Sequence, residues 1–212
     1  MPEHRFLYCW FDTEYTQLDL DRAKLLEVAV IVTDDELRPV KSAAPKIPSE
    51  LLREDGFSAF LTPPPDDELS DYVQEHFKPL LERCRREGRR AEEIDEYLNA
   101  YLESFPESLA DDVRVRPVLA GNSVYADFFL ARKYLPRFLR HLSYRLFDVT
   151  TFKIEWQYHH RGERFKKLGQ TELIRNLYKG QDAILGDQHD AYYDVQASIA
   201  ELTYYRSKLR KR

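Results

Sequence analysis

The 212-residue sequence has only two cysteines, no long apolar run and no excess of positive charge, and each shortage excludes a class of protein. Cys9 and Cys84 provide neither a disulfide framework nor the spacing of a cysteine metal site. No run of about 18 apolar residues occurs, and the first residues lack the basic and apolar segments of a signal peptide. We therefore expect a soluble, cytoplasmic protein that does not enter a membrane.

The balance of charges also limits how the chain binds its partners. The formal charge is -5 at pH 7, from 32 Lys and Arg against 37 Asp and Glu. Domains that hold nucleic acid by bulk electrostatics are usually basic. We expect any contact with nucleic acid to be confined to a local site.

The distribution of apolar residues predicts an α/β fold in a single domain, residues 1–212. Hydrophobic residues make up 43% of the chain, which is enough for one substantial core. Strands are expected at 6–12, 25–34, 113–121 and 144–152, a proline-rich loop at 42–65, and helices at 69–88, 91–105, 126–142 and 189–209. This alternation predicts a central mixed β-sheet flanked by helices.

Two acidic residues interrupt the first predicted strand, in FLYCWFDTEYTQLDL. Alternate side chains of a strand share a face, so Asp12 and Glu14 would lie side by side. Two ionised carboxylates at low dielectric repel each other, which calls for a shared proton, a basic partner or a bound cation. The pair alone is equally compatible with a strand that ends by Asp12 and a solvated loop.

Two downstream segments supply further candidate residues. In PVLAGNSVYADFFLARKYLP, Ser123 is placed to cap a helix that carries Asp127 on an early turn. In GDQHDAYYDVQASIAELTYYR, His189 precedes or begins a helix and Asp194 follows five residues later. Taken singly, an aspartate on an early helical turn often only compensates the helix dipole, and a histidine before a helix is more often a cap or a surface residue.

Taken together, these motifs resemble the DEDD exonucleases of the histidine subtype, and most closely the oligoribonuclease family. The family pattern Asp-x-Glu-x-Thr-x-Leu and the Leu-Glu-Ile strand after it are matched by DTEYTQL and LLEVAVIVTD. YLPRFLRHLSYRLFDVTTFK and DVQASIAELTYYR are similar to later family segments. The resemblance is poor at 42–110. It implies an RNase H-like/exonuclease fold in which 63–110 form a divergent helical insertion.

The resemblance implies that Asp12, Glu14, Asp127 and Asp194 hold two divalent cations, Mg²⁺ or Mn²⁺. Clustered carboxylates without cysteines favour such hard cations over zinc. Two ions about 4 Å apart clamp a phosphodiester in enzymes of this kind. His189 would act as general base toward the attacking water, since histidine titrates near neutral pH. The implied reaction is 3′ to 5′ hydrolysis of short single-stranded RNA to nucleoside 5′-monophosphates.

The resemblance also maps substrate contacts onto this chain. In the family a leucine after the acid pair wedges against the terminal base, and Leu18 occupies that position, although Gln17 replaces the usual preceding glycine. Family members cap the 5′ phosphate with a small-residue loop, a helical histidine and a Tyr-Arg pair of the partner subunit, which implies a homodimer. Ser123 matches the loop position, and its neighbour Asn122 is a further candidate contact. Tyr144 and Arg145 match the pair, although Ser143 replaces the usual preceding histidine. Tyr72 and His76 stand for the family's aromatic and histidine, with their spacing offset by one position. Leu18 fits a core leucine nearly as well, and Tyr72 and His76 also fit plain helix-face residues.

Two alternatives use the same residues differently. DNA is the substrate of proofreading and repair exonucleases in the same superfamily, although the segment SYRLFDVTTFK favours the oligoribonucleases. An exonuclease fold without activity serves as a binding or scaffold module, but such modules usually lose at least one acid and all five catalytic positions are filled here. The altered 42–110 region leaves the preferred substrate length open.

Overall fold

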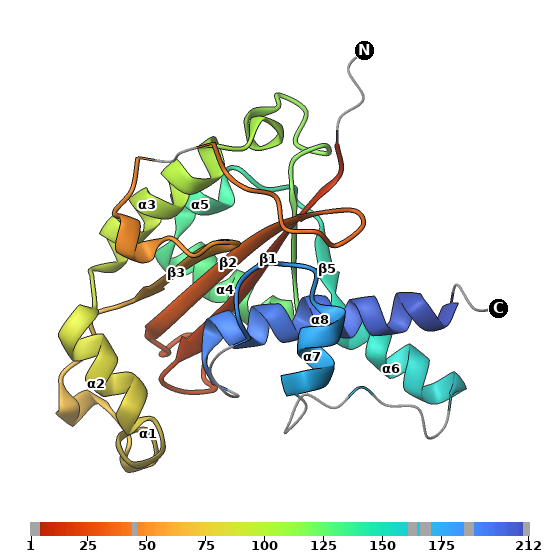
Figure 1. The fold of residues 1–212 in the computed structure, drawn as a ribbon. Helices are drawn as coiled ribbons and strands as arrows, with labels where there is room; N and C mark the ends of the chain where they lie inside the picture. Colours follow the sequence, from red (N-terminus) through yellow and green to blue (C-terminus); the bar gives the residue numbers. More distant parts are fainter. Residues whose placement is uncertain (1–4, 44–45, 161–164, 166–170, 185–188, 210–212) are drawn as a thin grey trace.

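The computed structural model describes residues 5–43, 46–160, 165, 171–184 and 189–209. A five-stranded sheet in the order β3-β2-β1-β4-β5 runs through the molecule (Figure 1). Its strands are β1 (Leu7–Tyr15), β2 (Leu25–Asp34), β3 (Gly56–Phe60), β4 (Val118–Gly121) and β5 (Leu146–Asp148). β2 is antiparallel to both β1 and β3, whereas β4 is parallel to both β1 and β5. The mixed sheet flanked by helices is the architecture that the sequence predicted.

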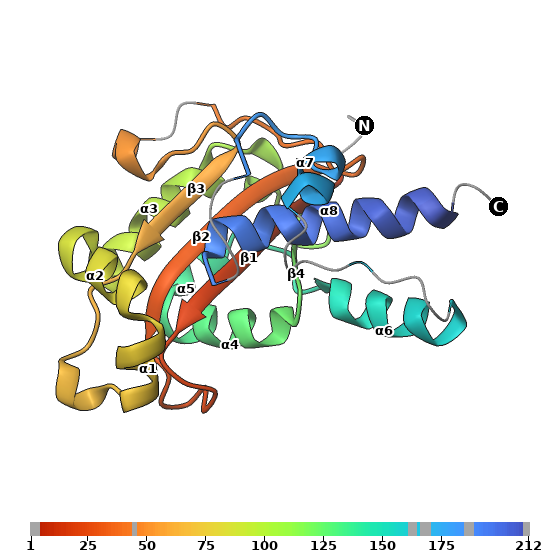
Figure 2. The ribbon, with the colours of Figure 1, turned by 60° about the horizontal axis from the view of Figure 1, so that its bottom comes forward.

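Helices cover both faces of the sheet (Figure 2). One face carries α3 (Ala91–Glu103), α4 (Val124–Tyr134) and α5 (Pro136–Leu139), and the other carries α6 (Val149–His159), α7 (Thr171–Leu177) and α8 (Ala191–Leu209). The short helices α1 (Asp71–His76) and α2 (Lys78–Glu87) pack beside β2 and β3. Three 3-10 turns lie at Ser49–Leu51, Asp66–Glu68 and Pro106–Leu109. None of the described helices is long and apolar enough to cross a bilayer.

The alternation of β1 decides where its acids point. Cys9 and Phe11 pack into the core under α3, α4 and α5, while Trp10 packs into the core under α8. Asp12 and Glu14 continue the side of Trp10, because alternate residues of a strand share a face. β1 extends past both acids, so they do not lie in a solvated loop.

The 63–110 segment divides between two parts of the structure. α1 and α2 form a small apolar cluster with Leu26 and Phe60 at one end of the sheet. α3 instead contributes Leu98 to the main core. The buried carboxylate of Asp95 on α3 accepts a 2.9 Å hydrogen bond from the backbone N–H of Phe138 in α5. Only α1 and α2 therefore stand apart from the main core.

Several elements differ from the sequence-based expectation. The proline-rich stretch 42–65 contains the edge strand β3. The strand expected at 144–152 ends at Asp148, because the Asp148 side chain accepts the backbone N–H of Thr150 and begins α6. The helix expected at 126–142 breaks before Pro136. The helical stretch 69–88, expected to be interrupted at Pro79, breaks two residues earlier, at Phe77. α6 and α7 were not predicted.

Candidate active site

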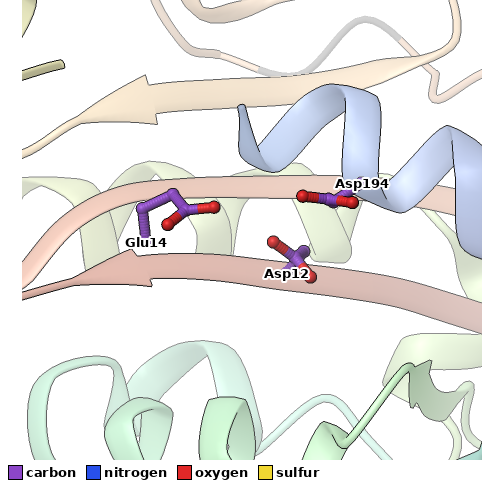
Figure 3. Close-up of side chains that lie close together, drawn as sticks. All are labelled: Asp12, Glu14 and Asp194. Atoms are coloured by element: carbon purple, nitrogen blue, oxygen red, sulfur yellow. The ribbon is translucent and has the colours of Figure 1, made fainter. Parts of the chain in front are cut away.

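Three carboxylates meet where β1 passes the first turn of α8 (Figure 3). Carboxylate oxygens of Asp12, Glu14 and Asp194 all lie within 4.8 Å of one another. Glu14 and Asp194 are buried and Asp12 is half-buried. Oxygen atoms this close together, on three acids held by a strand and a helix, can bind one hard cation in common.

The electrostatics of the group favour a bound cation. Burial, followed by the carboxylates of Asp194, Glu27 and Asp127, raises the pKa of Glu14 to about 8. The ionised cluster is thus destabilised by desolvation and by repulsion between like charges. An all-carboxylate donor set with this repulsion fits a divalent cation such as Mg²⁺ or Mn²⁺.

Asp127 lies on the first turn of α4, as predicted, and α4 packs on the face of the sheet opposite to α8. Its Oδ1 accepts a 2.7 Å hydrogen bond from Thr13 Oγ1. Burial raises the pKa of Asp127 to about 7, although the bond from Thr13 acts in the opposite direction. Its carboxylate is outside the group of three, yet it lines the same cavity.

His189 lies two residues before the start of α8 and close to Glu14. Its Nδ1 is 3.9 Å from Glu14 Oε2, and its side chain is 61% exposed. Its backbone N–H donates to Asp194 Oδ2 over 3.2 Å. An imidazole next to carboxylates and open to water has the position that a general base requires.

A cavity of about 810 Å³ opens at these residues. It is lined by all five predicted catalytic residues and by Leu18, Tyr72, Asn122 and Ser123 of the predicted substrate contacts. The side chain of Leu18 is 90% exposed, so this residue is not a core leucine. The cavity is large enough for a nucleotide unit and places an exposed apolar side chain at its mouth.

Three predicted substrate contacts lie outside this cavity. The ring of His76 stacks on that of Tyr72, with centroids 4.1 Å apart, and only Tyr72 lines the cavity. Tyr144 and Arg145 are exposed, and the Arg145 guanidinium lies 5.5 Å from the centre of the Tyr144 ring. Within one chain, this Tyr-Arg pair does not line the cavity that contains the carboxylates.

Phe77 is a cavity residue that the sequence analysis missed. It separates α1 from α2, and its ring centroid lies 5.7 Å from that of His189. The available signal was an aromatic residue at the helix break in EHFKPLL. Its role depends on how the two helices fold over the site, which spacing along the chain does not specify.

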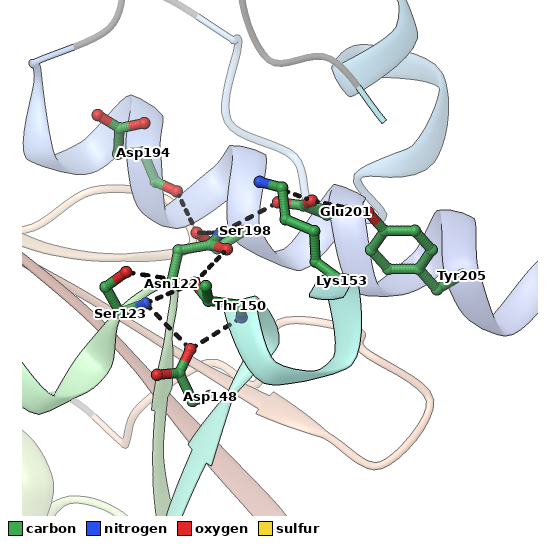
Figure 4. A network of polar contacts seen from close by, with 9 residues as sticks. All are labelled: Asn122, Ser123, Asp148, Thr150, Lys153, Asp194, Ser198, Glu201 and Tyr205. Carbon is green, nitrogen blue, oxygen red and sulfur yellow. Dashed lines mark hydrogen bonds and ion pairs between the residues drawn. The ribbon is translucent and has the colours of Figure 1, made fainter. Parts of the chain in front are cut away.

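A polar network supports the cavity behind the carboxylates (Figure 4). Asn122 Nδ2 donates to Ser198 Oγ over 2.8 Å and to Glu201 Oε2 over 3.2 Å. Ser198 Oγ donates to the backbone carbonyl of Asp194 over 2.8 Å. Glu201, whose side chain is fully buried, also pairs with Lys153 Nζ at 3.2 Å. The Asn122 amide therefore joins the end of β4 to α8, in addition to lining the cavity.

Ser123 occupies the predicted N-cap position of α4, but its side chain makes no capping hydrogen bond. Its backbone has the left-handed φ of 53°. The N–H of Ser123 donates to Asp148 Oδ1 over 3.0 Å and to Thr150 Oγ1 over 2.8 Å. The left-handed turn thus directs Ser123 toward the start of α6 instead of toward the N–H groups of α4.

Comparison with known sequences identifies a matching family and several similar proteins. A model of the Exonuclease family (RNase_T) matches residues 9–202. The mitochondrial oligoribonuclease of Bos taurus is 30% identical, over 96% of this chain and 73% of the relative. A probable oligoribonuclease of Schizosaccharomyces pombe is 30% identical over 93% of this chain and 66% of the relative. The oligoribonuclease of Francisella tularensis is 28% identical over 94% of both chains.

Solved structures support the fold assignment. E. coli exonuclease I in complex with a dA16 oligonucleotide gives a TM-score of 0.64 at 15% identity, over 98% of this chain and 42% of that one. Exonuclease I from Methylocaldum szegediense gives 0.61 at 17% identity, over 97% of this chain and 41% of that one. This chain thus spans less than half of these exonuclease I chains, with which it shares the RNase H-like exonuclease fold. From the family match over most of its length and from relatives at 30% identity, the chain belongs to the exonuclease family and, within it, to the oligoribonucleases.

Proposed function

We propose that this chain is a metal-dependent 3′ to 5′ exoribonuclease that hydrolyses short single-stranded RNA to nucleoside 5′-monophosphates. One observation supports the proposal above the others. Asp12, Glu14 and Asp194 form a compact carboxylate group next to an exposed histidine, and all four side chains line one cavity. An arrangement of this kind serves hydrolysis of a phosphodiester better than binding alone.

The carboxylates of Asp12, Glu14, Asp127 and Asp194 are the residues that would hold two Mg²⁺ or Mn²⁺ ions. Bound ions of this kind neutralise phosphodiester charge and make a bound water more acidic. His189, exposed beside Glu14, would accept the proton of the attacking water. Leu18, which projects from the turn after β1, would contact the terminal base.

Aromatic side chains of α1 and the α1–α2 junction would hold the bases. Tyr72 and Phe77 both line the cavity, and Tyr72 is 62% exposed. Stacking of a base on an aromatic ring contributes about 1–3 kcal/mol per base and tolerates any sequence. Such contacts suit an enzyme that degrades short RNA without regard to its sequence.

Residues 1–212 would act as a single exonuclease domain in the cytoplasm. The family match runs through the divergent 63–110 segment, and α3 of that segment shares the main core. Cys9 and Cys84 are buried free thiols, which suits a reducing compartment.

The proposed enzyme is a homodimer in which Tyr144 and Arg145 complete the cavity of the partner subunit. Both side chains are exposed and lie outside their own cavity. β5, which follows them, is an edge strand, and edge strands that remain exposed are prone to pair with another chain. Exposed apolar side chains are also found on β5 (Leu146), on the neighbouring α4 (Tyr125 and Phe129) and on α6 (Ile154 and Tyr158).

Activity is tested with 5′-labelled RNAs of two, five and twenty nucleotides in Mn²⁺, with DNA of the same lengths in parallel. We expect rapid loss of the diribonucleotide, and we expect Asp12→Ala and His189→Ala to abolish it. If only the longer RNAs are trimmed, the assignment of the catalytic residues stands and the proposed cap on the 5′ phosphate is wrong. Cleavage of DNA in preference to RNA, or no metal-dependent cleavage, would overturn the proposal.

The shared cavity is tested by mixing two variants that are each inactive on the diribonucleotide. Asp12→Ala disables hydrolysis, and Arg145→Ala disables the cap. In a mixed dimer the subunit with intact Asp12 receives Arg145 from its partner. Equal mixing therefore restores about a quarter of all sites if the pair acts across subunits. If activity does not recover although light scattering shows dimers, Tyr144 and Arg145 either act within their own chain or do not belong to the site.

A further inference from the structure

Helices α1 and α2, which we call the inserted helices, contact His189 and Asp190, two consecutive residues of the turn that carries the proposed general base. Arg83 Nη1 on α2 lies 3.2 Å from Asp190 Oδ2. The ring of Phe77, between α1 and α2, lies 5.7 Å from the ring of His189. α1 and α2 belong to the segment that matches the oligoribonuclease pattern poorly. This divergent segment therefore reaches the catalytic turn itself.

The turn at His189 has a conformation that needs support. Its φ of 72° lies in the left-handed region, which is unfavourable for a residue with a side chain. Asp190 precedes α8 and accepts the backbone N–H of Tyr193 on Oδ1 over 3.1 Å, as an N-cap residue does. Its carbonyl accepts the N–H of Asp194 over 2.9 Å. Asp190 therefore joins the histidine turn to the helix that carries a proposed metal ligand.

Arg83 is itself held firmly by the sheet. Its guanidinium carbon lies 4.2 Å from the centre of the Phe60 ring on β3, a cation–π geometry. The next residue, Cys84, is buried and donates from Sγ to the backbone carbonyl of Leu26 on β2 over 3.1 Å. Arg83 thus extends from a helix that is anchored to the sheet. Its guanidinium lies over the Phe60 ring, and one of its nitrogens pairs with the carboxylate of Asp190.

We propose that Arg83 is a positioning residue for His189. It fixes the carboxylate of Asp190, and Asp190 in turn fixes the left-handed turn that keeps the imidazole beside Glu14. The inserted helices then orient the general base as well as cover the substrate cavity. This inference rests on the proposed function, in which His189 accepts the proton of the attacking water.

The neighbouring Arg85 provides a matched control. It lies two residues further along α2 and pairs with Asp66, which is largely exposed. Arg83→Met and Arg85→Met each remove one guanidinium from the same helix and retain most of the apolar stem. Arg83→Lys retains a positive charge directed at Asp190. Only the first of these three variants should release the catalytic turn.

The experiment measures kcat and KM on a 5′-labelled diribonucleotide in Mn²⁺, together with amide hydrogen exchange of residues 190–195. We expect Arg83→Met to lower kcat about ten- to a hundredfold with little change in KM, because a displaced catalytic group slows the reaction more than binding. The amides of Tyr193 and Asp194 should exchange faster in this variant. Arg83→Lys should recover most of the rate, and Arg85→Met should behave as the unaltered protein.

Two results would overturn the inference. One is an unchanged exchange rate at Tyr193 and Asp194 in Arg83→Met. The other is an equal loss of kcat in Arg85→Met, which would indicate a general effect of charge on α2. If the unaltered protein cleaves no RNA, the proposed function fails separately, and hydrogen exchange still decides whether Arg83 holds the turn.

Discussion

The wall and the rim of the cavity are held by different kinds of contact. We use wall for the lining residues Asn122 and Asp194 together with Lys153, Ser198 and Glu201, which support them from behind. We use rim for the lining residues Phe77 and His189 together with the ion pair of Arg83 and Asp190 beside them. On the wall, the fully buried carboxylate of Glu201 contacts Asn122, Lys153 and Tyr205. On the rim, one ion pair joins the side chains of Arg83 and Asp190, which are 38% and 22% exposed.

Exposure determines what each part contributes. A buried charge that loses its partner is strongly destabilising, whereas an exposed pair contributes about 0–1 kcal/mol. The wall therefore couples the site to the stability of the fold, while the rim can change with little effect on folding. The divergent helices α1 and α2 lie at the rim. Substrate selection can thus diverge there while the carboxylates stay in place.

The largest expected effect concerns the carboxylate that the wall presents to the cavity. Asp194→Asn removes one charge from the group formed with Asp12 and Glu14. We expect kcat on a diribonucleotide to fall at least about a thousandfold, since stabilisation of transition-state charge is lost. The metal-free protein should become more stable, by about 2–4 °C for each kcal/mol of repulsion removed, because Asp194 raises the pKa of Glu14. Initial rates in Mn²⁺ measure the loss of kcat, and calorimetry in EDTA measures the change in Tm. A variant that stays active would remove Asp194 from the site.

A second prediction compares the stability of wall and rim directly. Lys153→Met leaves the buried carboxylate of Glu201 without its cationic partner, so we expect a loss on the order of 3 kcal/mol in the free energy of unfolding. Arg83→Met breaks a part-exposed pair and should cost less than about 1 kcal/mol. Urea unfolding measures both. The double variant Lys153→Met with Glu201→Gln should recover much of the loss. Equal costs for the two single variants would contradict the comparison.

The pH dependence of the metal-free protein gives a third prediction. The pKa of Glu14 is raised from 4.5 to about 8 and that of Asp127 from 3.8 to about 7. At pH values between the unfolded-state and folded-state pKa of each group, the folded state binds more protons than the unfolded state. The free energy of unfolding therefore falls as pH rises through this range. We expect Tm in EDTA to decrease from pH 5 to pH 8, and Mn²⁺ to oppose the decrease. Glu14→Gln should make the decrease shallower, because Asp127 still titrates, and a Tm that rises with pH in EDTA would contradict the assignment of these carboxyls.

The sequence was sufficient for the parts of the site that lie on regular elements. Once the first strand continues through both acids, its alternation puts Asp12 and Glu14 on one face, and Asp127 and Asp194 lie on the first turns of two helices. These positions depend on local geometry, which spacing along the chain encodes. Four of the five strands, β1, β2, β4 and β5, and most of the flanking helices were predictable for the same reason. The grouping of the four acids in one site came from the family resemblance.

The contacts that join distant elements could not be predicted. Arg83 and Asp190 are 107 positions apart, and nothing near either residue indicates the other. The same holds for Lys153 and Glu201, which meet only because α6 packs on α8. β3 was missed because it has five residues and follows a proline-rich stretch, so its strand character depends on pairing with β2.

The smallest expected effect concerns Leu18, a cavity residue without a role in folding. Its side chain is 90% exposed, so Leu18→Ala should change the free energy of unfolding by less than about 0.5 kcal/mol. Contact with a terminal base would bury it, and burial of a leucine contributes about 1.5–3 kcal/mol. We therefore expect KM for the diribonucleotide to rise about tenfold with little change in kcat, measured by initial rates in Mn²⁺. Leu109→Ala, which alters a 55% exposed leucine outside the cavity lining, is the control. Equal KM values for the two variants would show that the turn after β1 does not contact the substrate, and selection at the rim would then rest on α1 and α2.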